Sequence, residues 1–293
     1  MPESSYTKIE NPPSPMPWED YKAIIDTEWD RLLSSIQKGE ERRVQAFLET
    51  HPCMMPGASH FPFHTGKGSF PTAVISQPPL RGLTTKIPDF MWLTIDSATL
   101  HVILVEIESP LKRWFTNKGN PHSDFTQAQT QLVSWKQWFE ISEHKALFYR
   151  TYQIPCDLQR LRFNLVFVLI YGRRQEFADK PHLNTRRGYL AHLGEHLMTF
   201  DRLSPDREAD TYMCVRLVES VEGPVYEALS IPPTLTLGPG LARYRSLIGK
   251  RDIVVHQNPW ISPARKQFLV ERFSYWDEWT RNHRGYFQGN YRE

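Results

Sequence analysis

An α/β fold, in which helices flank a mixed β-sheet, is the fold class that the sequence predicts. Segments 101–110 and 161–174 are rich in Val, Ile and Leu, as buried strands are. Between them, residues 124–141 repeat their apolar side chains at helical spacing. A strand, helix, strand succession joins parallel strands by a right-handed crossover, so we expect a sheet that is partly parallel.

Composition limits the class of protein. The chain has 293 residues, of which 40% are hydrophobic, enough for one large or two modest domains with a packed core. A net charge of +2 does not by itself indicate nucleic-acid binding. Cys53, Cys156 and Cys214 lack the spacing of a metal site, and no apolar segment matches a secretion leader or a membrane span. We therefore expect a cytoplasmic protein without disulfides and with no membrane partner.

The first third of the chain predicts helices followed by irregular structure. Residues 1–17 are rich in Pro and Ser, which indicates an arm that is disordered or lies on the surface. Apolar residues recur at helical spacing over 18–37, and a second helix is expected within 39–52. Residues 53–81 are dominated by Pro, Gly and His, so we expect an irregular covering segment there.

Residues 86–110 predict two strands joined by a tight turn near Ser97 and Ala98. A turn centred there puts Asp89 directly opposite Glu106, where cross-strand Cβ atoms are about 4.5–5.5 Å apart. Glu108 lies two positions beyond Glu106 and so on the same face. Three unpaired carboxylates at the end of an apolar hairpin would each cost several kcal/mol, and a divalent cation between them would remove that cost.

The crossover helix is expected to begin at Asp124 as N-cap, with Gln127 completing a capping box. Its core face would carry Ala128, Leu132, Trp135 and Phe139, with Gln127 and Gln131 on an adjacent face. Farther on, the sequence predicts a short helix after residue 183, strands at 197–200 and 211–218, and a closing helix that begins at Ser262 and Pro263.

The acidic residues match a known nuclease arrangement. An acid at a strand start, two acids two positions apart on the partner strand and a helix with Gln residues resemble the PD-(D/E)XK core, here Pro88-Asp89 and Glu106-Ile107-Glu108. In this interpretation Asp89 and Glu106 hold Mg²⁺ or Mn²⁺, which polarises the scissile phosphate and lowers the pKa of a bound water. Oxygen ligands without nearby Cys or His favour these ions over zinc.

Ordinary structural roles are the alternative. An Asp after Pro is often a turn residue, and Glu108 would be a solvated charge because Ser109-Pro110 ends the strand. Gln127 and Gln131 would then be surface glutamines. Glu106 is the hardest to explain in this way, because apolar residues precede it without interruption from Val102.

Further segments narrow the resemblance to one family. EERRVQAFLETHP, KIPDF, VEIESP, FTQAQTQLVSW, LIYGRR and HLMTFDRL resemble, in order and spacing, the nuclease domain of the Shedu anti-phage proteins over residues 40–205. The resemblance implies a PD-(D/E)XK fold at 40–205, with an N-terminal arm and helix at 1–39 and a C-terminal extension at 206–293. It implies an endonuclease that cuts or nicks DNA, works as a homo-oligomer and protects bacteria against phage.

The same resemblance assigns roles to residues. Asp89 and Glu106 correspond to metal ligands, Gln127 and Gln131 to helix residues beside the site, and Glu41 or Gln45 to weaker candidates on the first helix of that domain.

At one position the chain departs from the family, which usually has Lys where this chain has Glu108. Either a three-carboxylate site is active, or the protein is a weakened module that binds nucleic acid or assembles with a partner. The basic residues Lys112, Arg113 and Lys118 follow directly, where a phosphate backbone would lie. No nucleotide cofactor is expected, because GxxxxGK and GxGxxG motifs are absent.

Overall fold

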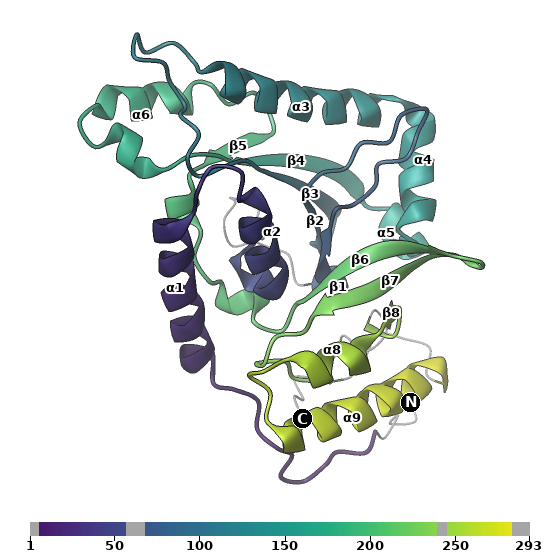
Figure 1. Cartoon of the computed structure of the whole chain (residues 1–293). Helices are drawn as coiled ribbons and strands as arrows, with labels where there is room; N and C mark the ends of the chain where they lie inside the picture. Colours follow the sequence, from purple (N-terminus) through teal and green to yellow (C-terminus); the bar gives the residue numbers. More distant parts are fainter. Residues whose placement is uncertain (1–5, 57–67, 239–244, 283–293) are drawn as a thin grey trace.

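The computed structural model describes residues 6–56, 68–238 and 245–282. In this part of the chain, eight strands form one sheet in the order β5-β4-β3-β2-β1-β6-β7-β8 (Figure 1). The strands are β1 Gly68–Ser76, β2 Phe90–Ile95, β3 Thr99–Ile107, β4 Arg162–Ile170, β5 Glu195–Met198, β6 Met213–Ser220, β7 Gly223–Ser230 and β8 Ile248–Gly249. The helices are α1 Trp18–Ser35, α2 Glu41–Thr50, α3 Ser123–Glu140, α4 Ser142–Thr151, α5 Cys156–Gln159, α6 Pro181–Gly188, α8 Arg251–Gln257 and α9 Pro263–Asn282.

The sheet is mixed, as the sequence predicts. Strands β3, β4 and β5 pair in parallel, as do β1 and β6, whereas β2 runs antiparallel to both of its neighbours. The carboxyl ends of β1, β3, β4, β5 and β6 therefore meet the start of β2 at one edge of the sheet. We call this edge the carboxyl edge. Ligand sites of α/β sheets commonly lie just beyond such an edge.

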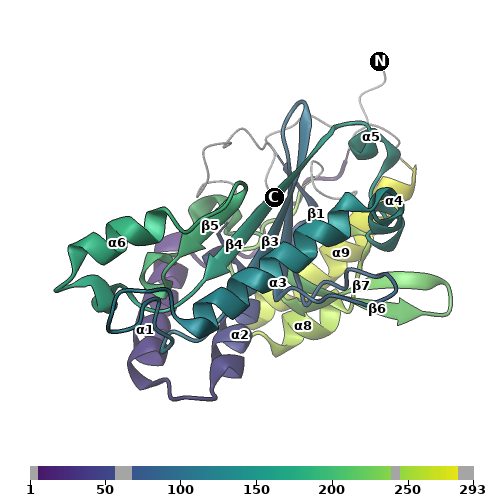
Figure 2. The ribbon, with the colours of Figure 1, turned by 90° about the horizontal axis from the view of Figure 1, so that it is seen from above.

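Helices cover both faces of the sheet (Figure 2). Val102 and Leu104 of β3 point to the face covered by α3, and Ile103 and Val105 point to the face covered by α1 and α2. Alternation along a strand therefore sends Glu106 toward the α3 face. In the described ranges, no helix has both the length and the apolar character needed to cross a membrane.

The two ends of the described chain meet at α9 (Figure 1). Arg265 donates from Nη1 to the Pro13 carbonyl at 2.7 Å, and the Thr7 N–H donates to Tyr275 Oη at 2.6 Å. Arg272 also donates to the Thr7 carbonyl. From residue 6 onward, the N-terminal arm is thus bound along α9, which agrees with the surface-lying alternative and not with a disordered arm.

Of the irregular structure predicted over 53–81, residues 57–67 lie outside the described ranges, and the prediction is wrong for residues 68–76, which form strand β1. Its apolar core, Phe70, Ala73, Val74 and Ile75, is buried. The register against β2 shifts between Ser69 and Val74, and such an irregularity accommodates a proline within a strand. Pro71 and the neighbouring glycines therefore hid the strand.

The start of α3 also differs from the prediction. The helix begins at Ser123, and its N-cap is His122, whose Nδ1 accepts from the Asp124 N–H at 3.3 Å. Asp124 is therefore in the first turn, where its charge suits the helix dipole, and it forms no capping box with Gln127. Trp138 is buried on the core face of α3, whereas Phe139 is only partly buried.

Candidate active site

The β2–β3 hairpin has the predicted register. Phe90 pairs with Val105 and Leu93 with Val102, which puts Asp89 opposite Glu106 in the same register. The turn is fixed by Asp96, whose Oδ1 accepts from the N–H groups of Ala98 and Thr99, both at 2.7 Å. Asp89 remains part of the sheet edge, because its carbonyl accepts from the Gln77 N–H at 2.8 Å. The two acids therefore meet at the carboxyl edge.

Asp89 and Glu106 form a contacting pair of carboxyl groups. Asp89 Oδ2 accepts from the Ile107 N–H at 2.7 Å, and a side-chain hydrogen bond joins the two acids. Glu106 is only 6% exposed. Among the residues described, no group donates to Glu106 Oε2, although this atom is buried. A buried carboxyl oxygen without a partner is costly and marks an incomplete site.

Electrostatics keep this pair from ionising fully. Burial, followed by the charges of Asp89 and Glu108, raises the pKa of Glu106 well above its usual range. Burial also raises the pKa of Asp89, although the Ile107 N–H opposes that shift. At neutral pH the pair therefore retains a proton, which Glu106 donates toward Asp89.

Glu108 is held differently from the other two acids. Its carboxylate forms an ion pair with Nζ of Lys112, which lies four residues later in the following loop. The Glu108 N–H donates to the Ile170 carbonyl at 2.9 Å, so this residue still extends the edge of β3 beside β4. The sequence predicted three converging carboxylates. The structure brings two into contact and joins the third to a lysine.

The Asp89–Glu106 pair fits a divalent cation in its donor chemistry. In the described ranges, no three His, Cys, Asp or Glu side chains gather as a ready metal site. However, Glu106 Oε2 lacks a partner, and both acids carry oxygen donors of the kind that Mg²⁺ and Mn²⁺ prefer. A cation would use that oxygen, and its charge would favour the ionised form of both acids against the burial that raises both pKa values.

The helix candidates lie apart from this pair. Gln127 and Gln131 of α3 are exposed, and neither side chain forms a hydrogen bond with any described residue. The inward-facing glutamine of α3 is Gln129, whose Nε2 donates to the Leu190 carbonyl at 2.7 Å and to Glu195 at 3.1 Å. Glu195 also forms an ion pair with Lys136 at 2.6 Å, so this network ties α3 to β5.

Of the candidates on α2, Glu41 has no side-chain partner in the described ranges, and Gln45 joins a polar cluster. Gln45 donates to Glu49 and to Ser76 Oγ, both at 3.2 Å, and Arg216 donates to Glu49 at 3.3 Å. Ser76 ends β1 beside Asp89, but it shares a face with Val74, which packs against α1 and α2. The Glu49 cluster thus lies on the face opposite the acid pair. Sequence reasoning missed Glu49 because its partners come from distant strands.

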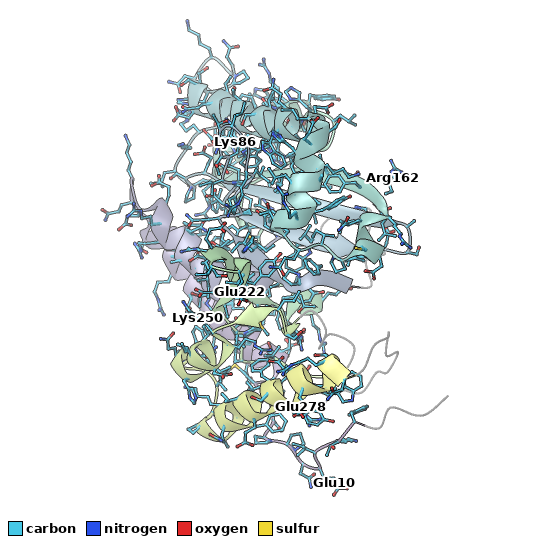
Figure 3. The ribbon with its side chains drawn as sticks, turned by 90° about the vertical axis from the view of Figure 1, so that its right-hand side faces the viewer. Glu10, Lys86, Arg162, Glu222, Lys250 and Glu278 are labelled. Atoms are coloured by element: carbon cyan, nitrogen blue, oxygen red, sulfur yellow. The ribbon has the colours of Figure 1, made fainter. Side chains whose placement is uncertain are left out.

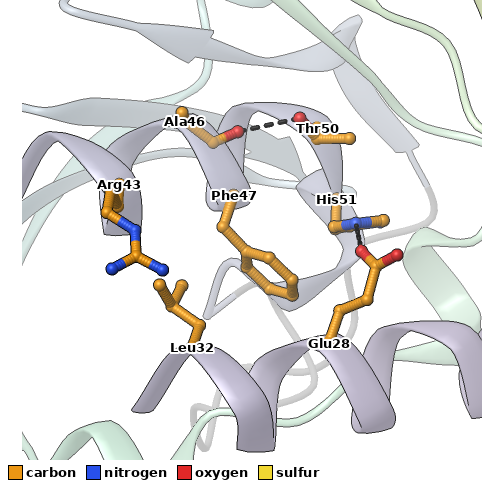
Figure 4. A pocket seen from close by; sticks show the side chains of 7 residues that line it. All are labelled: Glu28, Leu32, Arg43, Ala46, Phe47, Thr50 and His51. Carbon is orange, nitrogen blue, oxygen red and sulfur yellow. Dashed lines mark hydrogen bonds and ion pairs between the residues drawn. The ribbon is translucent and has the colours of Figure 1, made fainter. Parts of the chain in front are cut away.

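An open pocket of about 320 Å³ lies between α1 and α2 (Figure 4). His51 lies at one end, almost fully buried, with Nδ1 3.0 Å from Tyr21 Oη and Nε2 3.3 Å from Glu28. Burial lowers the pKa of His51 to about 4. The pocket is lined by Glu28, Leu32, Arg43, Ala46, Phe47, Thr50 and His51.

This histidine should make folding sensitive to acid. The pKa of His51 is lower in the folded protein than in the unfolded chain, so its contribution to stability is complete above about pH 6.5 and is lost as pH falls toward about 4. We expect a loss of about 2 kcal/mol in the free energy of unfolding between pH 7 and pH 5, reduced by the nearby Glu28 charge. Urea unfolding of the parent and of His51→Gln at several pH values measures this loss of stability. Equal pH slopes for the two proteins would contradict the assignment.

A comparison with known protein families identifies the region that contains the acid pair. The family model described as "Shedu protein SduA, C-terminal" matches residues 38–204, which is more than half of the chain and includes the acid pair. A search of curated proteins found no match.

Proposed function

Because the chain belongs to the Shedu family, we propose that it is a metal-dependent endonuclease that nicks or cleaves DNA in bacterial defence against phage. Family membership supports the defence role. The nuclease proposal depends chiefly on one observation, the buried Asp89–Glu106 pair with an unpartnered oxygen at the carboxyl edge. We further propose a PD-(D/E)XK-type core, a homo-oligomeric state and a cytoplasmic location.

Each acid would have a distinct role. Asp89 and Glu106 would hold Mg²⁺ or Mn²⁺, and the Ile107 N–H fixes the orientation of Asp89. When bound, such a cation supplies polarisation of a phosphate oxygen and acidifies a water molecule. Glu108 would orient that water and accept its proton, because it lies beside Glu106 on the same strand end. Lys112 would hold Glu108 in position through the ion pair.

Incubation of the purified protein with plasmid and with linear DNA tests this proposal. Parallel reactions contain Mg²⁺, Mn²⁺ or EDTA, and Glu195→Gln serves as the control for a buried acid outside the site. We expect nicked or linear products only with a divalent cation. Products that persist in EDTA, or no products under any condition, would contradict a metal-dependent nuclease.

One observation favours a second function. Glu108 replaces the lysine usual in the family and is already paired with Lys112, so the site has no free amine on β3. A catalytically weakened module that binds nucleic acid or assembles with a partner would have these features. Such a module would bind DNA in EDTA and would show no cation-dependent products.

The loop after the acids should contribute to DNA binding. Arg113 and Lys118 are exposed, and among described residues the Arg113 guanidinium donates only to the Asn117 side chain, at 3.0 Å, whereas Lys112 is engaged by Glu108. Replacing Arg113 and Lys118 by Gln should lower the slope of log affinity against log salt by about 0.9 per lost phosphate contact, regardless of DNA sequence. Fluorescence anisotropy of a labelled duplex in EDTA measures this slope.

A matched control uses two arginines at the opposite edge of the sheet. Arg160 and Arg162 are exposed at the start of β4, and Figure 3 labels Arg162 there. Arg160→Gln with Arg162→Gln removes the same charge without touching the carboxyl edge. If this control weakens binding as much as the loop variant does, the effect is one of net charge and the loop is not a contact.

A further inference from the structure

Three arginines gather beyond the ends of β4 and β5. Arg174 begins the 3-10 turn Arg174–Phe177 after β4, and Arg202 ends the turn Phe200–Arg202 after β5. Arg187 comes from α6, and it is close enough to both turns for the charges of Arg174 and Arg202 to act on it. Burial, followed by the charges of Arg202 and Arg174, lowers the pKa of Arg187. The charge of Arg202 also helps to lower the pKa of His196, after burial.

The fold fixes this arrangement through its backbone. The Phe200 N–H donates to the Gly172 carbonyl at 3.1 Å, which joins the two turns. Arg187 lies over the Trp114 ring at 5.2 Å, and its Nη1 donates to the Leu197 carbonyl at 2.8 Å. The half-buried guanidinium is therefore held in place, and the arginines of the two turns stand near it.

The acids of these two turns, Glu176 and Asp201, are engaged by other donors, Glu176 by the N–H groups of Trp114 and Phe115. Asp201 lies between the turns, but its carboxylate accepts from Arg173 Nε at 2.8 Å and from the Arg174 N–H at 2.5 Å. Among the described residues, the guanidinium groups of Arg174 and Arg202 form no ion pair and no hydrogen bond, and both residues are exposed. Like charges held together cost free energy, and a bound anion removes that cost.

The position of the cluster identifies the anion. Strands β3, β4 and β5 are parallel neighbours, so both turns lie along the same carboxyl edge as Glu106. Neighbouring strands are about 4.8 Å apart, which puts the turn after β5 roughly 10 Å along the edge from the end of β3. Measured along the helix axis of a duplex, that distance corresponds to about three nucleotides of one strand, at about 3.4 Å each. A backbone with its scissile phosphate at the acid pair would thus carry further phosphates toward the arginines.

We infer that Arg174, Arg187 and Arg202 form a binding site for backbone phosphates of DNA, a few nucleotides from the phosphate that is cut. The DNA identity of the ligand depends on the proposed function. Guanidinium groups suit phosphate oxygens, because they donate two hydrogen bonds in a fixed plane. The site adds contacts to the phosphate backbone and reads no bases, so it contributes affinity independent of sequence.

The test compares Arg174→Gln/Arg202→Gln with the control Arg160→Gln/Arg162→Gln, which removes the same charge at the other end of β4. Binding of a labelled duplex is measured in EDTA over a range of NaCl concentrations, so no cleavage is required. The first variant should lose at least about tenfold in affinity and about 2 in the log–log salt slope, and the control should retain both. Because Arg174 and Arg202 are exposed, thermal unfolding of the first variant should match the parent or rise.

Each outcome has a definite meaning. A slope and affinity equal to those of the parent, equal losses in both variants, or a parent that binds no DNA would overturn the inference. A parent that binds DNA through these arginines but forms no product with Mg²⁺ or Mn²⁺ would instead overturn the nuclease proposal and keep the inference. Arg187→Lys, which retains the charge but loses the planar fork, should weaken binding with little change in slope.

Discussion

Asp89→Asn and Glu106→Gln are each expected to lose DNA cleavage by about 10³-fold or more, while the metal-free protein becomes more stable. The loss follows because each amide removes a charged oxygen donor from the proposed cation site. The gain follows from the shared proton. Burial and the neighbouring charges hold the pKa of Glu106 far above its unfolded value, so ionisation of this residue opposes folding.

The raised pKa of Glu106 fixes the direction in which stability changes with pH. A carboxyl group whose folded-state pKa is raised stabilises the protein below its unfolded pKa, about 4.5, and loses that contribution as pH rises. In EDTA the parent should therefore lose stability on going from about pH 5 to about pH 8, by a few kcal/mol as an order of magnitude. Glu106→Gln should flatten this slope. Urea unfolding at several pH values gives the free energy, and the plasmid assay gives the rate.

The two measurements separate catalysis from folding. A variant that is already unfolded without urea and fails to cut DNA has lost its structure, and its inactivity says nothing about the site. Parent-like cleavage by either variant would exclude Asp89 and Glu106 as metal ligands. Glu195→Gln is the matched control, because Glu195 is also a buried acid but is paired with Lys136. This control should lose stability and keep activity per folded molecule.

The second large effect is expected at Glu108. Glu108→Gln should lose most cleavage, about 10²-fold, while metal affinity changes little, because the amide cannot accept a proton from water. Glu108→Lys puts an amine where the family usually has one, but beside Lys112, and the two ammonium groups would repel. We therefore expect Glu108→Lys to fold and to keep some cleavage.

A charge exchange sharpens this prediction. The double variant Glu108→Lys/Lys112→Glu restores an ion pair with the amine on the strand end, so it should cut DNA faster than Glu108→Lys alone. The cycle of the two single variants and the double variant gives the coupling between the residues. Undiminished cleavage by Glu108→Ala would make Glu108 a bystander. The proton acceptor would then be bulk water or the substrate phosphate.

The hairpin that carries the acids could be predicted in detail. A tight turn fixes the register of two antiparallel strands, so counting from Ser97 and Ala98 was enough to pair Asp89 with Glu106. The crossover to β4 was also predictable, because strand and helix periods differ and parallel strands require such a connection. These features depend on residues that are close in the sequence.

Features assembled from distant segments could not be predicted. Strand β1 was hidden by Pro71, and its other neighbour, β6, lies in the last third of the chain. The periodic pattern did not decide which glutamines of α3 face the solvent. Gln127 and Gln131 are exposed, whereas Gln129 faces inward. The arginine cluster combines two turns and a helix, which local patterns do not relate. The Glu108–Lys112 pair is local, but the loop conformation that joins its members has no periodic signal.

The parallel pairing of β1 with β6 also has a consequence for synthesis on the ribosome. Residues 73–76 pair with residues 213–216, and the arm at Pro13 is bound by Arg265, 252 positions later. Contacts this distant form slowly, because a long loop must close first. The hairpin with both acids can form early, but the sheet is completed only after β8 has emerged, and the arm is bound only after α9 has. A nascent chain would thus carry its proposed cutting residues without the finished scaffold until β6, β8 and α9 have emerged, which delays activity to that point.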